Sequence, residues 1–124
     1  MSVKTYTVRV SFSGVELDDD DRDVEASKLL RQMRDLDGVE SAKRLVDENP
    51  PANNKSVGGF IVGALTAEIN TESASKVFSF FKERLSGKPI EMEVEANGKK
   101  LRVKANSSKE LLAAVEAAER FVSA

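Results

Sequence analysis

The chain has 124 residues, a net charge of −2 at pH 7, and neither cysteine nor histidine. This length suits one domain with its own core, and we expect a single α+β domain over residues 1–124. Without cysteine and histidine the chain lacks thiolate metal ligands, disulfides and the commonest general base, which disfavours an enzyme or a metal protein.

The 19 basic and 21 acidic residues are interleaved along the chain. A basic surface of the kind that binds nucleic-acid phosphates is therefore not expected. The longest apolar stretch, residues 60–65, is far shorter than the ~20 residues of a membrane span, and the N-terminus does not resemble a signal peptide. We expect a cytoplasmic protein with no nucleic-acid and no membrane partner.

The first part of the chain predicts a strand, a helix and a second strand. Residues 4–12 alternate between apolar and polar side chains, as half-buried strands do. Asp20 or Asp21 can cap the helix, and Gly38 stands where a left-handed residue ends one. The apolar stripe of this helix is Ala26, Leu29, Leu30, Met33 and Leu36. Residues 39–46 predict the second strand.

The middle of the chain is the least regular part. Residues 47–59 contain two prolines, three asparagines and two glycines, and we expect a flexible loop there. The apolar residues 60–69 suit a buried strand or a short helix, and we favour the helix. Asn70 or Thr71 can cap the next, amphipathic helix, whose apolar positions are Ala74, Val77, Phe78, Phe81 and Leu85.

Asn97-Gly98 is the strongest local signal, because both residues tolerate the positive φ of a type I′ hairpin turn. The turn sets the register of residues 90–105. The facing polar pairs are Glu95 with Lys100, Glu93 with Arg102, and Glu91 with Lys104. The facing apolar pairs are Val94 with Leu101, Met92 with Val103, and Ile90 with Ala105. A slip by one residue would turn the apolar set to water.

Ser107 and Glu110 form a capping-box pattern that begins a final helix. The expected order is therefore β-α-β-α-α-β-β-α. About four short strands, with one face exposed to water, need their three to four helices on the other face. We expect a two-layer α+β sandwich.

Motifs that would carry chemistry are absent. The acidic run at residues 16–23 lacks the glycine and glutamate spacing of a calcium loop, and we interpret it as a solvated loop. Gly58-Gly59 is not followed by the Gly-Lys-Ser/Thr of a phosphate-binding loop. Ser-Lys neighbours such as Ser75-Lys76 do not face each other on a helix. We therefore assign no catalytic, cofactor-binding or metal-binding residue.

Three segments carry a family resemblance: LLRQMRDLDGV in the first helix, VGGFIVGAL after the Pro- and Gly-bearing linker, and ASKVFSFFKERLSGKP before the hairpin. With the terminal helix SSKELLAAVEAA, this pattern resembles the effector-associated constant component proteins of the first type. The family has tryptophans where this chain has Met33 and Phe80 or Phe81. The resemblance implies a small adaptor in bacterial conflict or defence systems. Its partner would be a co-encoded caspase-like or trypsin-like peptidase, TIR domain or signalling NTPase.

We expect a non-catalytic adaptor whose partner contacts are Gly58, Gly59, Phe60, Ile61 and Phe80. They belong to an apolar segment beside a long loop, or, for Phe80, lie off the apolar stripe of a helix. A free strand edge could also support a homo-oligomer. The alternative function is a ferredoxin-like domain that senses a small ligand, against which the C-terminal hairpin and helix argue. A third hypothesis is a carboxylate-based enzyme, with or without a metal.

Overall fold

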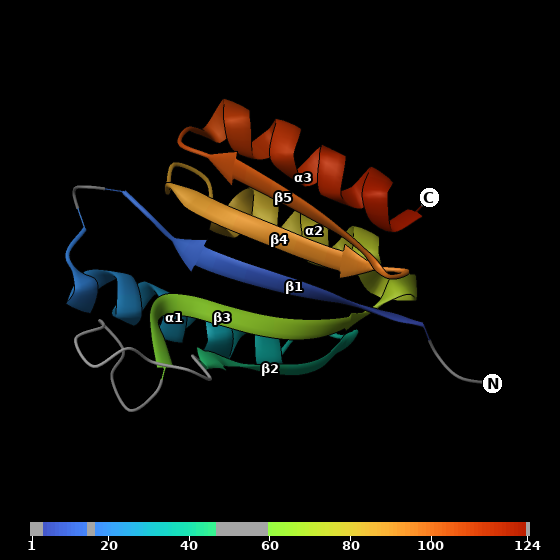
Figure 1. Ribbon diagram of the computed structural model, residues 1–124, viewed down its shortest axis with the longest axis horizontal. Coiled ribbons are helices and arrows are strands. Elements are labelled where there is room, and N and C mark those ends of the chain that lie inside the picture. The colour runs from blue at the N-terminus through green and yellow to red at the C-terminus, as the bar shows by residue number, and fades with distance from the viewer. Residues whose placement is uncertain (1–3, 15–16, 47–59, 124) are drawn as a thin grey trace.

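The computed structural model describes residues 4–14, 17–46 and 60–123. This part forms an antiparallel five-stranded sheet in the order β2-β3-β1-β4-β5, with three α-helices behind it (Figure 1). The elements are β1 (Thr5–Phe12), α1 (Asp19–Arg34), β2 (Val39–Val46), β3 (Phe60–Asn70), a 3₁₀ turn η1 (Thr71–Ser73), α2 (Ala74–Arg84), β4 (Ile90–Ala96), β5 (Lys99–Ala105) and α3 (Ser108–Ser123). The α+β class is confirmed, whereas the expected strand count of about four is too low by one.

The first six main elements follow the order β-α-β-β-α-β, with β1 between β3 and β4. This is the split βαβ connectivity of ferredoxin-like folds. The C-terminal hairpin and helix do not argue against that connectivity, contrary to our expectation, because β5 adds to the sheet beside β4 and α3 packs on β5, β4 and α2. The topology alone assigns no function.

The prediction of a helix over residues 60–69 is wrong, because these residues form most of strand β3. β3 pairs with β1 on one side and with β2 on the other. From Leu65 on, β3 alternates as a half-buried strand does, with Leu65, Ala67 and Ile69 buried. The preceding residues 60–64 do not alternate, so the apolar run as a whole does not show a strand period. The order β-α-β-α-α-β-β-α is corrected accordingly to β-α-β-β-α-β-β-α, with η1 before α2.

The hairpin prediction is confirmed residue for residue. Asn97 and Gly98 have φ values of +54° and +75°, and all six facing pairs of β4 and β5 occur as expected. Arg102 lies 2.8 Å from Glu93, and Lys104 lies 3.1 Å from Glu91. Glu95 instead lies 3.4 Å from Arg9 of β1, so the charge pairs extend across three strands.

The first two helices bury the stripes that the sequence indicates, except that Leu36 lies beyond the end of α1 and is half-buried. The first cap also differs. Asp18, and not Asp20 or Asp21, is the N-cap of α1, and its Oδ1 accepts a hydrogen bond of 2.8 Å from the backbone N–H of Asp21. Asn70 caps η1 through the backbone N–H of Glu72 at 2.8 Å. The core between sheet and helices includes Tyr6, Leu29, Phe78, Phe81 and Leu111, each almost fully buried.

Candidate functional site

The start of β3 bends away from the rest of the strand at Gly63. This glycine has φ of +70°, and the register between β2 and β3 shifts between Arg44 and Val46. The described pairing with β1 ends at Ser11 and Ala64, so residues 60–63 of β3 extend past it. Such a bulge changes the direction of the side chains that precede it.

Asp23 of α1 holds this bulge in place. Its Oδ1 accepts a 3.0 Å hydrogen bond from the backbone N–H of Gly63 and forms an ion pair with Arg44 of β2. The guanidinium carbon of Arg44 lies 5.4 Å from the centre of the Phe60 ring, within cation–π range. α1, β2 and the start of β3 are therefore tied together by one carboxylate and one guanidinium.

Three apolar side chains are exposed at this place. Val46 faces Phe60 across the β2–β3 pair, and Ile61 follows in the chain. Their exposed fractions are 50% for Val46, 39% for Phe60 and 36% for Ile61. We call these three residues the apolar edge patch. Most large apolar side chains in the described ranges are buried, so three exposed ones together mark a candidate interaction surface.

The structure brings only part of the expected interface together. Phe60 and Ile61 belong to the apolar edge patch, whereas Gly58 and Gly59 lie outside the described residues. Phe80 is on α2, half-buried, with its ring 5.9 Å from that of Phe81, and packs against the core. Sequence reasoning missed Val46, because only the β2–β3 pairing places this strand end beside Phe60.

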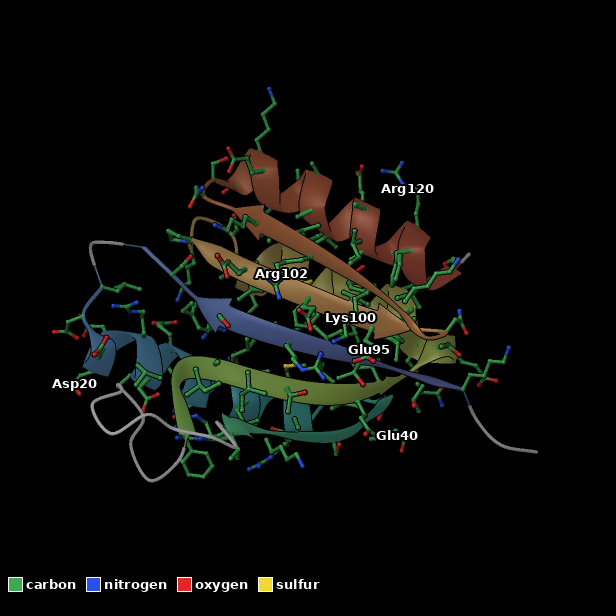
Figure 2. The ribbon with its side chains drawn as sticks, in the orientation of Figure 1. Asp20, Glu40, Glu95, Lys100, Arg102 and Arg120 are labelled. Atoms are coloured by element: carbon green, nitrogen blue, oxygen red, sulfur yellow. The ribbon has the colours of Figure 1, made fainter. Side chains whose placement is uncertain are left out.

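The open face of the sheet is polar and internally paired. Arg9, in the central strand, lies 2.8 Å from Glu93, which also accepts a 2.8 Å hydrogen bond from Arg102. Figure 2 shows Glu95, Lys100 and Arg102 on the β4–β5 hairpin. The hydrogen bond from Arg102 and the positive charge of Arg9 lower the pKa of Glu93, against the opposing effect of burial. The outward positions of β1 are Thr5, Thr7, Arg9 and Ser11, which offer no aromatic ring for a nucleic-acid base to stack on.

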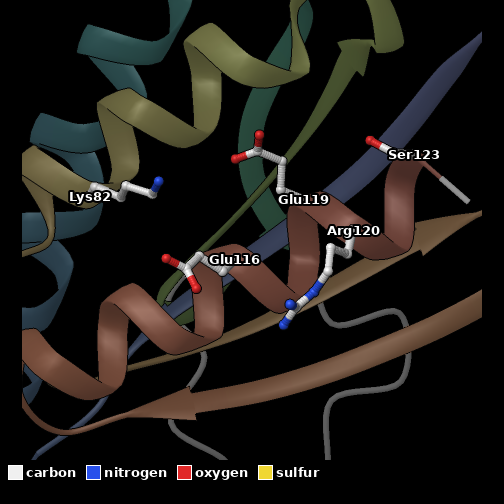
Figure 3. Close-up of a pocket in the computed structure, with 5 residues that line it drawn as sticks. All are labelled: Lys82, Glu116, Glu119, Arg120 and Ser123. Atoms are coloured by element: carbon white, nitrogen blue, oxygen red, sulfur yellow. The ribbon is translucent and has the colours of Figure 1, made fainter.

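Two hollows border the helices. One, of about 310 Å³, lies between α2 and α3 and is lined by Lys82, Glu116, Glu119, Arg120 and Ser123 (Figure 3). Its two acids and two bases favour no ligand of a particular charge. A larger one, of about 600 Å³, lies where the α2–β4 and β5–α3 turns meet the end of β1; its described lining is Ser13, Gly14, Leu17, Glu25, Gly87, Lys88, Pro89 and Asn106. Hydrogen bonding to Lys88 lowers the pKa of Glu25 there.

Among the residues that the structure describes, no group of three or more acidic side chains is placed to hold a metal ion. Within the same ranges, none of the helices combines the length and the apolar character needed to cross a bilayer.

Comparison of the chain with protein-family models, with curated proteins and with solved structures gave no match. The candidate site therefore rests on the geometry of these residues.

Replacing Asp23 with alanine is expected to lower the free energy of unfolding by about 1–3 kcal/mol, because the Gly63 N–H and the largely buried Arg44 lose their shared partner. Urea unfolding of Asp23→Ala, Arg44→Met and the double variant measures the coupling between the two side chains. Asp19→Ala is the matched control, since its pair with Arg22 is more exposed and worth little. Strictly additive losses at Asp23 and Arg44 would contradict the linkage.

Proposed function

We propose that the protein is a non-catalytic adaptor that binds a protein partner through the apolar edge patch. One observation carries the proposal: residues 60–63 of β3 extend past the pairing with β1, and Phe60 and Ile61 are exposed there beside the Asp23–Arg44 pair. Apolar surface left in water costs roughly 25 cal/mol per Å² relative to buried surface. A partner that covers the exposed side chains would remove this cost, which is why such a surface suits an interface.

The kind of partner comes from the sequence resemblance to effector-associated constant component proteins. On that basis we propose a co-encoded effector, with a caspase-like or trypsin-like peptidase, TIR or signalling NTPase domain. An adaptor needs no catalytic group. The open face of the sheet is polar and paired, and three of the five exposed large apolar side chains in the described residues belong to the apolar edge patch.

Serine at both Phe60 and Ile61 is expected to weaken partner binding at least about tenfold, because both apolar contacts are lost. The tagged full-length chain is used to capture partners from the native host, and the dissociation constant is then measured with the purified partner. Leu112→Ser is the matched control: Leu112 is 48% exposed, but lies on α3.

Thermal unfolding shows whether the double variant still folds, so that a loss of binding can be assigned to the lost contacts. Because both side chains are partly exposed, its midpoint is expected to stay within a few degrees of the parent chain. Undiminished binding by the double variant would rule out this surface. A double variant that fails to fold would show that Phe60 and Ile61 serve the core, and the assignment of the interface would fail with it.

A ligand-sensing domain is the second candidate, favoured by the split βαβ connectivity together with the hollow of about 600 Å³. That volume is within the usual range for small-molecule sites. A thermal-shift screen of metabolites against the parent chain and Lys88→Ala tests it. One strongly stabilising compound whose effect depends on Lys88 would favour sensing over the adaptor function.

A further inference from the structure

The first turn of α1 is a dense group of carboxylates next to the apolar edge patch. Asp18, Asp19, Asp20 and Asp21 are consecutive, and α1 and β3 begin at the same end of the molecule (Figure 1). Arg22 pairs with Asp19 at 3.1 Å, while Asp18, Asp20 and Asp21 have no cationic side chain within 4 Å in the described part of the chain. Figure 2 shows Asp20 at the outer end of this turn.

The two residues that follow this turn, Arg22 and Asp23, connect it to the start of β3. A Cβ built on Gly63 would stand 2.9 Å from the Cβ of Arg22, so the helix backbone and the β3 bulge are in close approach. One residue further, Asp23 binds Gly63 and Arg44, and Arg44 lies over Phe60. Arg22 and Arg44, the two basic residues in these contacts, are each paired with an aspartate, whereas Asp18, Asp20 and Asp21 have no cationic partner in the described part of the chain. The charge of the turn is therefore negative.

We infer that the apolar edge patch, with the acidic turn Asp18–Asp21 at its border, binds a basic, apolar segment of a protein partner. The inference rests on the proposed function and specifies the chemistry of the partner. One or two apolar side chains of the segment pack on Phe60 and Ile61, while neighbouring Lys or Arg side chains face Asp20 and Asp21. Complementary charge speeds the encounter of two proteins and fixes their relative orientation. A patch of only three apolar side chains needs this contribution from its surroundings.

The same charges disfavour other occupants. Nucleic acid and anionic lipid surfaces would bring phosphates against the aspartates. Pairing through the free edge of β2 is also hindered, because Arg34 of α1 donates a 2.9 Å hydrogen bond to the Ala42 carbonyl at mid-strand.

The test uses two synthetic peptides with the same Leu and Phe positions, one carrying Lys and the other Glu between them. Fluorescence anisotropy measures binding to the full chain at about 50 mM and about 500 mM NaCl, where screening differs strongly. We expect the Lys peptide to bind and the Glu peptide not to, and the affinity for the Lys peptide to fall at high salt. Equal binding of both peptides, or no effect of salt, would overturn the inference.

Charge-matched variants place the effect on the acidic turn. Asp20→Asn with Asp21→Asn is expected to weaken binding of the Lys peptide about three- to tenfold. Asp35→Asn with Asp37→Asn removes the same charge at the far end of the helix, where both residues are exposed. This control pair is expected to change the affinity for the Lys peptide less than about twofold. Equal effects of the two pairs would mean unspecific attraction and would overturn the assignment.

The two proposals can fail separately. In one outcome, Phe60→Ser with Ile61→Ser weakens binding of the captured natural partner, but the Asp20 and Asp21 variants do not. The adaptor function then stands, and the inference of a basic partner segment is wrong. If neither set of variants affects the natural partner, the apolar edge patch is not the interface and both proposals fail.

Discussion

Gly38→Ala is expected to lower the free energy of unfolding by about 3 kcal/mol or more. Gly38 connects α1 to β2 with φ of +92°, a conformation that costs an alanine about 1 kcal/mol or more. An added Cβ would also stand 2.2 Å from the Cβ and 2.3 Å from the Oγ of Ser73. The Oγ can rotate away, but the Cβ is fixed to the Ser73 backbone, so the backbone itself must move.

The position matters because two chain reversals are locked together there. The Gly38 carbonyl accepts a 2.7 Å hydrogen bond from the backbone N–H of Asn70, which also caps η1 through its side chain. Moving residue 38 away from Ser73 therefore disturbs the end of β3 and the start of α2 together. Urea unfolding followed by far-UV circular dichroism measures the loss.

Gly87→Ala is the matched control for backbone strain. Gly87 has a similar φ of +79°, but a Cβ there would have nothing within 4 Å, so only the conformational cost of about 1 kcal/mol is expected. Ser73→Gly should restore part of the stability of Gly38→Ala by removing the atoms that clash. Equal losses at Gly38 and Gly87 would contradict the close packing of the two reversals.

The hairpin could be predicted in full because its information is local. Asn97-Gly98 specifies the turn, and each facing pair in β4 and β5 is a fixed number of residues from it. Most of the apolar stripes of α1 and α2 were predictable for the same reason, since a helical period relates residues only three or four apart.

The start of β3 could not be predicted, because its conformation depends on distant residues. Asp23 is 40 residues from Gly63 and 21 from Arg44, and no local pattern links them. Residues 60–69 read alone fit a helix as well as a strand, and the choice follows from the pairing with β1 and β2. The exposure of Phe60 and Val46 therefore appears only in the folded chain, whereas Phe60 and Ile61 could be selected as apolar residues beside a loop.

Tyr6 is a polar exception in the core. Its ring is 1% exposed and stacks on Phe78 with centroids 5.7 Å apart, and its hydroxyl has no hydrogen-bond partner among the described residues. Burial raises the pKa of Tyr6 far above its ordinary value, and the negative charge of Glu119 on α3 raises it further. A buried hydroxyl without a partner costs about 1–3 kcal/mol.

Tyr6→Phe keeps the stacked ring, removes the hydroxyl, and is expected to raise the free energy of unfolding by about 1–2 kcal/mol at neutral pH. In the parent chain the raised folded-state pKa means that stability is fully present below about pH 10, where unfolded tyrosine is neutral, and falls as the pH rises above that value. The advantage of Tyr6→Phe should therefore grow by about 1.4 kcal/mol between pH 8 and pH 11. Because Tyr6 is the chain's single tyrosine and tryptophan is absent, tyrosinate absorbance near 295 nm reports on Tyr6 alone. Ionisation near pH 10 in the folded chain, or a Tyr6→Phe variant less stable than the parent, would show that the hydroxyl is hydrated or hydrogen-bonded in solution.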